Sequence, residues 1–287
     1  MSSKVVLITG TNSGFGWLTA KTLAAAGHKV YATMRDTQSK NAAKAAELVQ
    51  ENNISVLDVS LTDDASVKGA VDQILANEGR IDVLVNNAGY SAMGVAESFS
   101  TEDVKEMFDL HVLAYWRLMK SVLPAMRQQA DGLIINISSG AGRFSFPFMT
   151  VYSAAKFGLE GLSEGLHYEV KQLGVDVALI EPGAFPTDII HKIKSGSDTG
   201  VVAGYGALAD IPNNMGSALG KLFEATNPNP QDVADAVQNL MNLPRGQRPL
   251  RTVVDPGTGH LVKAANDAVK AEYDKTITAF GMSELLA

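Results

Sequence analysis

The chain has 287 residues, of which 46% are apolar and 19% charged, a composition typical of a globular protein with a sizeable core. Its net charge of −7 argues against a general nucleic-acid surface, and the absence of cysteine excludes disulfides and thiolate metal sites. No apolar run approaches the ~20 residues of a membrane span. Because the first predicted strand begins at Lys4, we also expect no targeting peptide and a cytoplasmic location.

Strand-like and helix-like stretches alternate along the whole chain. Short apolar runs predict strands at 4–9, 29–33, 54–57, 81–85, 132–137, 175–180 and 250–254. Helical patterns lie between them, near 16–26, 39–51, 63–78, 101–128, 151–173 and 230–242. This alternation predicts an α/β fold in a single domain, residues 1–287, with a doubly wound parallel sheet and helices on both of its faces.

The most informative residues follow the predicted strands. Parallel sheets of this kind bind ligands beyond the carboxyl ends of their strands. Those ends carry Gly10, Met34-Arg35, Asp58, the segment 86–89, Ser138-Ser139 and Pro182-Gly183. The coincidence indicates a ligand site along one edge of the sheet.

A glycine-rich turn follows the first predicted strand. Its spacing is Gly-x-x-x-Gly-x-Gly, and a predicted helix that ends at Gly27 comes directly after it. A dinucleotide needs a tight turn, close approach of the backbone to its diphosphate and a helix N-terminus aimed at that diphosphate. An ordinary strand-turn-helix loop would use glycine in the same way. The candidate cofactor residues here are Gly10, Asn12, Ser13, Gly14, Phe15 and Gly16.

A tyrosine, a lysine and a serine have the spacing of a proton-transfer site. Tyr152 and Lys156 stand four residues apart on a predicted helix, so their side chains share one face. A free phenol titrates near ~10, and a fixed ammonium beside it favours the phenolate and lowers its pKa. Ser139 can hold a substrate oxygen against the phenol. Together the three residues predict acid-base chemistry on alcohols and ketones.

Five segments agree in order and spacing with a known family. They are Thr9-Gly10-x-x-x-Gly14-x-Gly16, Asn86-Asn87-Ala88-Gly89, Ser139, Tyr152-x-x-x-Lys156 and Pro182-Gly183. With these motifs the chain resembles the short-chain dehydrogenase/reductase family from about residue 4 to 190, with a weaker similarity at 250–254. The resemblance implies a Rossmann-type sheet and hydride transfer between a nicotinamide cofactor and a small-molecule carbonyl or alcohol.

The resemblance also implies roles for the candidate catalytic residues. Tyr152 is expected to be the acid/base, Ser139 to orient the reacting oxygen, and Lys156 to lower the pKa of the phenol and bond the nicotinamide ribose. Ser138 is the rival serine, but the family's spacing to the tyrosine favours Ser139. A serine there could also simply bond the backbone at the strand end.

Further cofactor contacts are implied by the same resemblance. Asn87, Ala88 and Gly89 belong to a segment that supports the sheet near the cofactor, although an Asn/Gly turn is its plain structural alternative. The other expected contacts are Asp58 and Val59 at the adenine, Pro182 and Gly183, and Thr187 at the carboxamide. Asp58 and Thr187 could instead serve as cap or turn residues.

One position departs from the family pattern. Where the family has asparagine in the helix predicted at 101–128, this chain has His111. Histidine can donate and accept, so a water relay through Lys156 could survive, with different geometry and titration. A core histidine without a catalytic part is the alternative. The remaining histidines lack metal-ligand spacing, and we expect no metal site.

The end of the second predicted strand bears on the choice of coenzyme. An NAD-type pocket places a carboxylate there to hold the ribose 2′-hydroxyl, but this chain has Met34. Arg35 follows, where a guanidinium can engage a 2′-phosphate in a bidentate way, and Asp36 starts the next loop. We therefore predict NADP(H), with NAD(H) as the alternative.

The substrate region gives weaker signals. Phenylalanines in 143–148, with Met93 and Phe185, could line an apolar pocket or belong to the core. Residues 188–229 are predicted to be a mobile lid over the substrate, and 260–287 a C-terminal extension with a helical pattern, placed at the substrate side or at an interface. The elaborate lid and the stretch 30–36 resemble those of members that act on hydrophobic alcohols and ketones, including hydroxysteroid and retinol types.

Small residues recur at near-helical spacing after Tyr152. They are Ala154, Gly158, Gly161 and Gly165. Because each interior glycine costs ~1 kcal/mol relative to alanine, close packing would have to compensate. That packing could be against the domain's own sheet or, as the resemblance implies, against another subunit in a homodimer or homotetramer.

Two other functions stay open at this point. A non-catalytic NADP(H)-binding regulator or redox sensor would keep the glycine turn and tolerate the replaced asparagine. An epimerase or dehydratase of the extended branch also carries Tyr-x-x-x-Lys, but the glycine spacing and the modest length argue against it.

Overall fold

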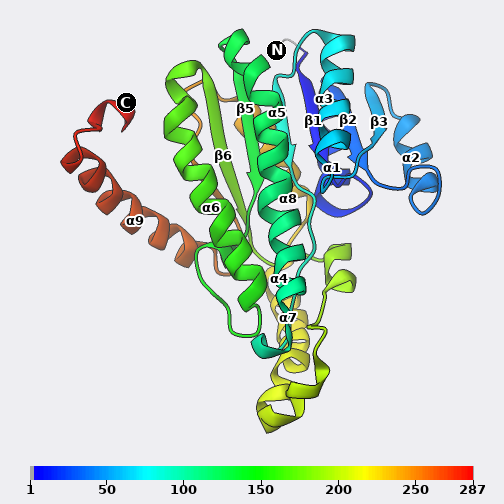
Figure 1. Cartoon of the computed structure of the whole chain (residues 1–287), viewed down its shortest axis with the longest axis vertical. Coiled ribbons are helices and arrows are strands. Elements are labelled where there is room, and N and C mark those ends of the chain that lie inside the picture. Colours follow the sequence, from blue (N-terminus) through cyan, green and yellow to red (C-terminus); the bar gives the residue numbers. More distant parts are fainter. Residues whose placement is uncertain (1–2, 287) are drawn as a thin grey trace.

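A seven-stranded parallel sheet forms the centre of the computed structural model, which describes residues 3–286 (Figure 1). The first two residues and the last residue of the predicted domain therefore lie outside the described part. The strand order is β3-β2-β1-β4-β5-β6-β7, as a doubly wound Rossmann-type sheet requires. The strands are β1 (Val5–Thr9), β2 (Lys29–Met34), β3 (Ile54–Asp58), β4 (Val83–Asn86), β5 (Gly132–Ile137), β6 (Val175–Pro182) and β7 (Arg251–Val254).

Helices cover both faces of the sheet. One face carries α3 (Asp64–Glu78), α5 (Ala114–Gln129) and α6 (Thr150–Val170), which lie in front in Figure 1. The other face carries α1 (Gly14–Ala25), α2 (Ala42–Val49) and α8 (Gln231–Asn242). In β1 the side chains of Val5 and Leu7 enter the first layer, and those of Val6 and Ile8 enter the second. Burial on both faces explains why the strands read as continuous apolar runs and confirms the predicted fold.

The helix predicted at 101–128 is interrupted. The structure has α4 (Thr101–Phe108), a π-helical turn (Asp109–Leu113) and then α5. A π turn inserts one extra residue into a helix, and such turns are frequent at functional sites. Here the turn contains His111, whose side chain is 1% exposed.

Most of the predicted lid is helical, which the sequence did not indicate. Residues 188–229 contain two 3₁₀ stretches, Asp188–Lys192 and Thr199–Asp210, followed by α7 (Ile211–Thr226). Helix α7 includes glycines and asparagines with low helix propensity, and this composition hid it. Figure 1 shows the whole segment extending past the ends of the strands.

Two polar contacts join the lid to α4. The backbone N–H and hydroxyl of Ser197 both donate to Asp103, and Lys194 Nζ lies 2.8 Å from Glu106. Asp103 also caps the start of α4 through Ser100. These hydrogen bonds, first of all those from Ser197, lower the pKa of Asp103 to about 2.

The predicted C-terminal extension forms α9 (Gly259–Ala279) and a short 3₁₀ turn. Helix α9 leaves the end of β7 and runs past α6, where Tyr273 stacks on Tyr168 with ring centroids 5.0 Å apart. Among the helices of the described residues, none is long and apolar enough to cross a membrane.

Candidate active site

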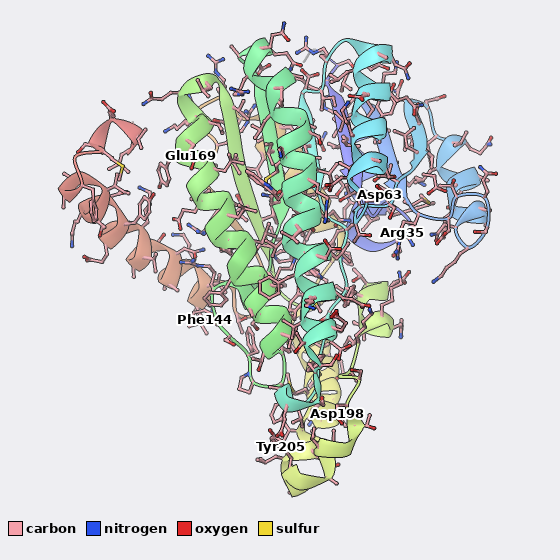
Figure 2. The ribbon with its side chains drawn as sticks, viewed as in Figure 1. Arg35, Asp63, Phe144, Glu169, Asp198 and Tyr205 are labelled. Atoms are coloured by element: carbon pink, nitrogen blue, oxygen red, sulfur yellow. The ribbon has the colours of Figure 1, made fainter. Side chains whose placement is uncertain are left out.

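A large cavity of about 1260 Å³ lies along the carboxyl ends of the strands. It begins near Arg35, passes the glycine turn and ends beneath the lid and α9, close to Phe144. Figure 2 shows Arg35 and Phe144 on opposite sides of the molecule. Most of the predicted site residues line this one cavity: Gly10, Asn12, Ser13, Gly14, Phe15, Arg35, Val59, Asn87, Ala88, Gly89, His111, Ser139, Tyr152, Lys156, Pro182, Gly183 and Thr187.

The glycine turn is shaped by close backbone contacts. Gly10 has φ +68°, and a Cβ atom there would lie 2.7 Å from Ala88 Cα. Gly14 has φ +56°, and the position of its Cβ lies 3.5 Å from Thr187 Cβ. Both glycines are thus required by conformation, and Gly10 by space as well. Gly16 is absent from the cavity wall. Its missing Cβ makes room for Asn87 Nδ2 and the Gly10 carbonyl oxygen.

Segment 86–89 is tied to the glycine turn. Thr9 Oγ1 accepts hydrogen bonds from the backbone N–H groups of Asn87 and Ala88, at 2.9 and 3.1 Å. Asn87 Nδ2 in turn donates to the carbonyl oxygen of Thr9 at 2.8 Å. Because the side chain and the backbone of Thr9 at the end of β1 hold these atoms, the two predicted motifs form one wall of the cavity.

Tyr152 and Lys156 lie one turn apart near the start of α6, and both are buried. Lys156 Nζ donates to the carbonyl oxygen of Ile137 at 2.9 Å, which fixes the lysine against the end of β5. Ser139 follows β5, and its Oγ accepts from the backbone N–H of Ala141 at 3.1 Å. The sheet end and α6 therefore bring the three predicted catalytic residues to the same part of the cavity.

The sequence predicts that Lys156 lowers the pKa of the Tyr152 phenol, but in the structure that pKa is raised. Burial raises the pKa of Tyr152 to about 12, against the opposing effect of the neighbouring Ser139 hydroxyl. Burial also lowers the pKa of Lys156 to about 7, although the Glu160 carboxylate acts in the other direction. The loss of hydration outweighs the local charges for both groups. The phenol is consequently neutral at neutral pH.

His111 packs directly against Tyr152, with ring centroids 5.6 Å apart. Its Nε2 lies 2.8 Å from the carbonyl oxygen of Tyr90 and 3.3 Å from the backbone nitrogen of the same residue. The shorter contact assigns the proton to Nε2, which leaves Nδ1 as an acceptor without a partner among the described residues. Burial, and then the charge of Lys156, hold the pKa of His111 well below its usual value. A Cβ atom on Gly89 would lie 2.5 Å from His111 Cε1, so glycine at 89 makes the space for this ring. His111 is a neutral side chain in the wall of the site.

Ser138 and Ser139 both line the cavity. The Ser138 hydroxyl lies 2.9 Å from the Cβ position of Gly142 and has no hydrogen-bond partner within residues 3–286. The Ser139 hydroxyl caps the short turn that follows it. The Ser138 hydroxyl is buried, whereas the Ser139 hydroxyl lies beside the phenol of Tyr152.

Asp58 is the second predicted cofactor residue that the cavity wall lacks. Its carboxylate accepts from the backbone N–H and the hydroxyl of Thr37, both at 2.8 Å. These bonds lower the pKa of Asp58 and support its alternative reading as a turn residue. Thr187, by contrast, makes no capping hydrogen bond with its side chain and faces the cavity.

The lid end of the cavity is mainly apolar. Met93, Phe144, Phe146 and Phe185 line the cavity as predicted, and Phe148 does not. Phe185 is also 3% exposed and packs edge to face on Phe15 at 5.4 Å. Sequence reasoning missed the residues that α7 and α9 supply, although the helical pattern near 261–268 was a signal for the second group. They are Met215, Ala218, Leu219, Leu222, Leu261, Val262 and Ala265.

A buried ionic cluster, which no local sequence pattern indicates, lies behind the catalytic helix. Arg251 on β7 contacts Glu160 at 2.9 Å, Glu164 at 3.1 Å and Glu181 at 3.5 Å, and Asn266 on α9 donates to Glu181 at 2.6 Å. Burial, and then the nearby Glu160 carboxylate, raise the pKa of Glu181 to about 7. The cluster connects α6, β6, β7 and α9 in one polar contact.

Comparisons with known proteins agree with this architecture. The family model of the short chain dehydrogenases matches residues 4–198. A 3-ketodihydrosphingosine reductase of Bacteroides thetaiotaomicron is 36% identical over 242 residues, which are 79% of this chain and 86% of the relative.

Solved structures also align over nearly the whole chain. A short-chain dehydrogenase from Streptomyces avermitilis has a TM-score of 0.78 at 30% identity and covers 98% of this chain and 97% of its own. A metagenomic short-chain oxidoreductase in complex with NADP has a TM-score of 0.69 at 26% identity, with coverage of 89% and 98%. By sequence motifs, sheet order and these alignments, the chain belongs to the short-chain dehydrogenase family.

Proposed function

We propose that the protein is an NADP(H)-dependent oxidoreductase that interconverts a hydrophobic ketone or aldehyde with its alcohol. The observation that carries this proposal is one cavity with the glycine turn at one end and Ser139, Tyr152 and Lys156 further along it. A cofactor held at the turn would therefore reach the acid-base residues. Membership of the short-chain dehydrogenase family supports the same reaction type.

The residues at the glycine turn fit a dinucleotide. Gly10 and Gly14 keep the turn free of side chains, and α1 offers the N–H groups of its first turn to an anion. The cavity exceeds the ~300–1,000 Å³ of ordinary ligand pockets, which leaves room for a substrate beside the cofactor. Arg35 at the end of β2 supports NADP(H) over NAD(H), because a guanidinium can pair with a 2′-phosphate. The NADP complex of the metagenomic relative is in line with this preference.

The titration of Tyr152 suits it to reduction. NADPH would supply a hydride to the carbonyl carbon, and the carbonyl oxygen would need a proton in the same step. A phenol with a pKa of about 12 keeps its proton at neutral pH and can donate it to that oxygen, which a serine hydroxyl at 139 would orient. The phenolate left behind would favour the ammonium form of Lys156. The ammonium of Lys156 would in turn stabilise the phenolate of Tyr152.

We further propose that His111 Nδ1 accepts a hydrogen bond from a water of the proton relay through Lys156 and orients that water. Because burial holds the pKa of His111 low, the imidazole does not itself carry the proton. Its Nδ1 is an acceptor in the cavity wall, and its ring touches the catalytic tyrosine. A neutral imidazole can accept a hydrogen bond there, as the amide of the family's asparagine can, without adding charge.

The substrate we propose is neutral and apolar over most of its length. The lid end of the cavity is walled by aliphatic and aromatic side chains from α7, α9 and the loop after β5. Asp255 also lies on this wall, but its carboxylate already accepts from the backbone of Gly257 and from Thr258. The 3-ketodihydrosphingosine reductase relative supports a long-chain ketone, and hydroxysteroids and retinoids remain candidates.

One screen tests the function. Purified protein and its Tyr152→Phe variant are compared on a panel of long-chain, steroidal and small polar carbonyls, with NADPH and NADH side by side. We expect turnover of apolar carbonyls with NADPH and a loss of ~10²–10⁴-fold in the variant, which keeps its cofactor affinity. Equal turnover by both proteins would refute the role of Tyr152. Tight NADPH binding without turnover of any carbonyl would favour the regulator.

A homodimer through α5 and α6 is our proposal for the assembly. Gly158 packs on the π turn through Val112, but a Cβ on Gly161 or Gly165 would meet nothing within 4 Å. Leu113, Trp116 and Phe157 are 37–47% exposed on the π turn and these helices. Light scattering on the purified protein would test this, because a monomer would leave this surface unexplained.

A further inference from the structure

A lysine of the lid reaches back to the glycine turn. Lys192 ends the 3₁₀ stretch Asp188–Lys192, and its Nζ donates to Ser13 Oγ at 3.0 Å across 179 residues of sequence. Ser13 is the N-cap residue of α1, and its own side chain makes no capping bond. Both Lys192 and Ser13 line the cavity. The contact is therefore a direct connection between the lid and the turn at which the proposed cofactor would bind.

The charge of Lys192 has the wrong sign for its position. A helix N-terminus carries a partial positive charge and favours anions, not cations. The first turn of α1 holds no acidic residue that would balance an ammonium. The carboxylate of Asp188 is 4.0 Å from Lys192 Nζ, and both side chains are about half exposed, so this pair contributes little. An ammonium is favourable beside this helix end when an anion lies between them.

The surrounding charges favour an anion as well. Arg35 and Lys40 line the same end of the cavity as Lys192, against the carboxylate of Asp36. Asp36 is held in the left-handed region, at φ +56°, by the loop that follows β2. Three cations and a helix N-terminus thus meet two carboxylates, those of Asp36 and Asp188, and the positive charge that remains favours a polyanion.

We propose that Lys192 is a lid residue that binds the cofactor's diphosphate and holds the lid closed over it. The inference rests on the proposed function, because it requires a dinucleotide at the glycine turn. The diphosphate is favoured over the 2′-phosphate because Lys192 contacts the N-cap of α1, whereas Arg35 stands at the end of β2. The family resemblance implies no cofactor contact on the C-terminal side of Thr187. Lys192 adds a cation from a segment that also shapes the substrate end.

Contacts on both sides of Lys192 would let one bound anion hold the whole segment 187–194 in place. Thr187 lies over Gly14 at the glycine turn. On the other side of Lys192, the backbone of Lys194 pairs with Ser91 and Met93 at 2.9 Å each. The segment 187–194 therefore crosses the cavity from the cofactor turn to the wall near Tyr90. A cation at position 192 that binds the diphosphate would hold the middle of this segment over the cavity.

The test is a binding measurement on the full chain. Dissociation constants for NADPH and NADH are measured by nicotinamide fluorescence for wild type, Lys192→Met, Lys192→Arg and the control Lys221→Met. Lys221 is exposed on α7 and lies outside the cavity wall, so its variant removes a lid charge elsewhere. We expect Lys192→Met to weaken both coenzymes about tenfold and the other two variants to bind within about twofold of wild type.

A second readout follows the lid itself. Chymotrypsin cleaves after aromatic residues such as Tyr205 and Phe223 in the lid, and it does not cleave after lysine. Protection of these peptide bonds by NADPH therefore reports closure of the lid. Wild type and Lys221→Met should be protected by saturating NADPH, and Lys192→Met should be cut at least several-fold faster at the same occupancy.

The possible results separate the two proposals. Equal affinities and equal protection in wild type and Lys192→Met would overturn the role of Lys192 while leaving the proposed function in place. Weakening of NADPH alone would overturn the assignment to the diphosphate. A wild-type protein that binds neither coenzyme would refute the proposed function itself.

Discussion

The imidazole ring of His111 lies edge to face against the phenol ring of Tyr152, with ring centroids 5.6 Å apart and ring planes at 88°. The same imidazole meets the ring of Tyr90 in a second edge-to-face contact, also at 5.6 Å. Because the ring is buried and neutral, it can fix the orientation of the phenol without adding a charge beside it. At the position where the family has asparagine, the imidazole ring of His111 therefore forms part of the wall beside Tyr152.

The first prediction concerns the acceptor nitrogen of His111. His111→Leu removes the acceptor and the contact with the Tyr90 carbonyl, whereas His111→Asn restores the family's amide. We expect His111→Leu to lower turnover about 10–100-fold, as loss of a proton-transfer partner does, and His111→Asn to stay within about threefold of wild type. Steady-state kinetics with NADPH measure both, and thermal unfolding checks that the variants are folded. If His111→Leu turned over as fast as wild type, the histidine would be a packing residue only.

The second prediction concerns Gly89, which makes room for that ring. A Cβ at 89 would lie 2.5 Å from His111 Cε1, so Gly89→Ala should lower the free energy of unfolding by about 1–3 kcal/mol. Combining it with His111→Ala should remove most of this cost, because the clashing ring is gone. Urea denaturation of the single and double variants gives the coupling. Gly69→Ala, which adds its methyl into open space on α3, is the matched control and should be neutral or slightly stabilising.

The third prediction concerns coenzyme preference. Arg35→Ala should raise the KM for NADPH by tenfold or more and change the KM for NADH by less than about twofold, because only NADPH carries the 2′-phosphate that a guanidinium can pair with. NADH serves as the internal control for folding and for the rest of the site. An unchanged preference would remove the argument for NADP(H).

The fourth prediction concerns the pH dependence of stability. The pKa of Glu181 is raised above its unfolded value of about 4.5 to about 7, so the folded state favours the protonated acid. The resulting stabilisation is present below pH 4.5 and is lost as the pH rises through 7. Glu181→Gln stays neutral at every pH and can still bond Asn266. The free energy of unfolding of the variant, relative to that of wild type, should therefore increase by about 2 kcal/mol between pH 5 and pH 8.

Denaturant titrations at pH 5, 6, 7 and 8 measure this difference. Glu169→Gln, at an exposed position on α6, removes one carboxylate from the surface and should show no such trend. A difference that stays flat with pH would mean that Arg251 keeps Glu181 ionised throughout, at 3.5 Å.

The sequence by itself determined the order of strands and helices, the glycine turn and the catalytic trio. These are local patterns: an apolar run of five residues indicates a buried strand, and the four-residue spacing from Tyr152 to Lys156 indicates one helix face. The parallel order then places every strand end at one edge, which is why the sequence alone groups Gly10, Asn87 and Ser139.

Only the tertiary structure decided the contacts between distant segments. Lys192 meets Ser13 across 179 residues, and Thr37 occupies one oxygen, Oδ2, of the Asp58 carboxylate that the family resemblance places at the adenine. Burial raises the pKa of Tyr152 where the spacing to Lys156 predicts a fall, because spacing reports which charges are near but not how much water is excluded. The π turn that places His111 against Tyr152 packs on α6 together with α4, and no local sequence pattern encodes this contact.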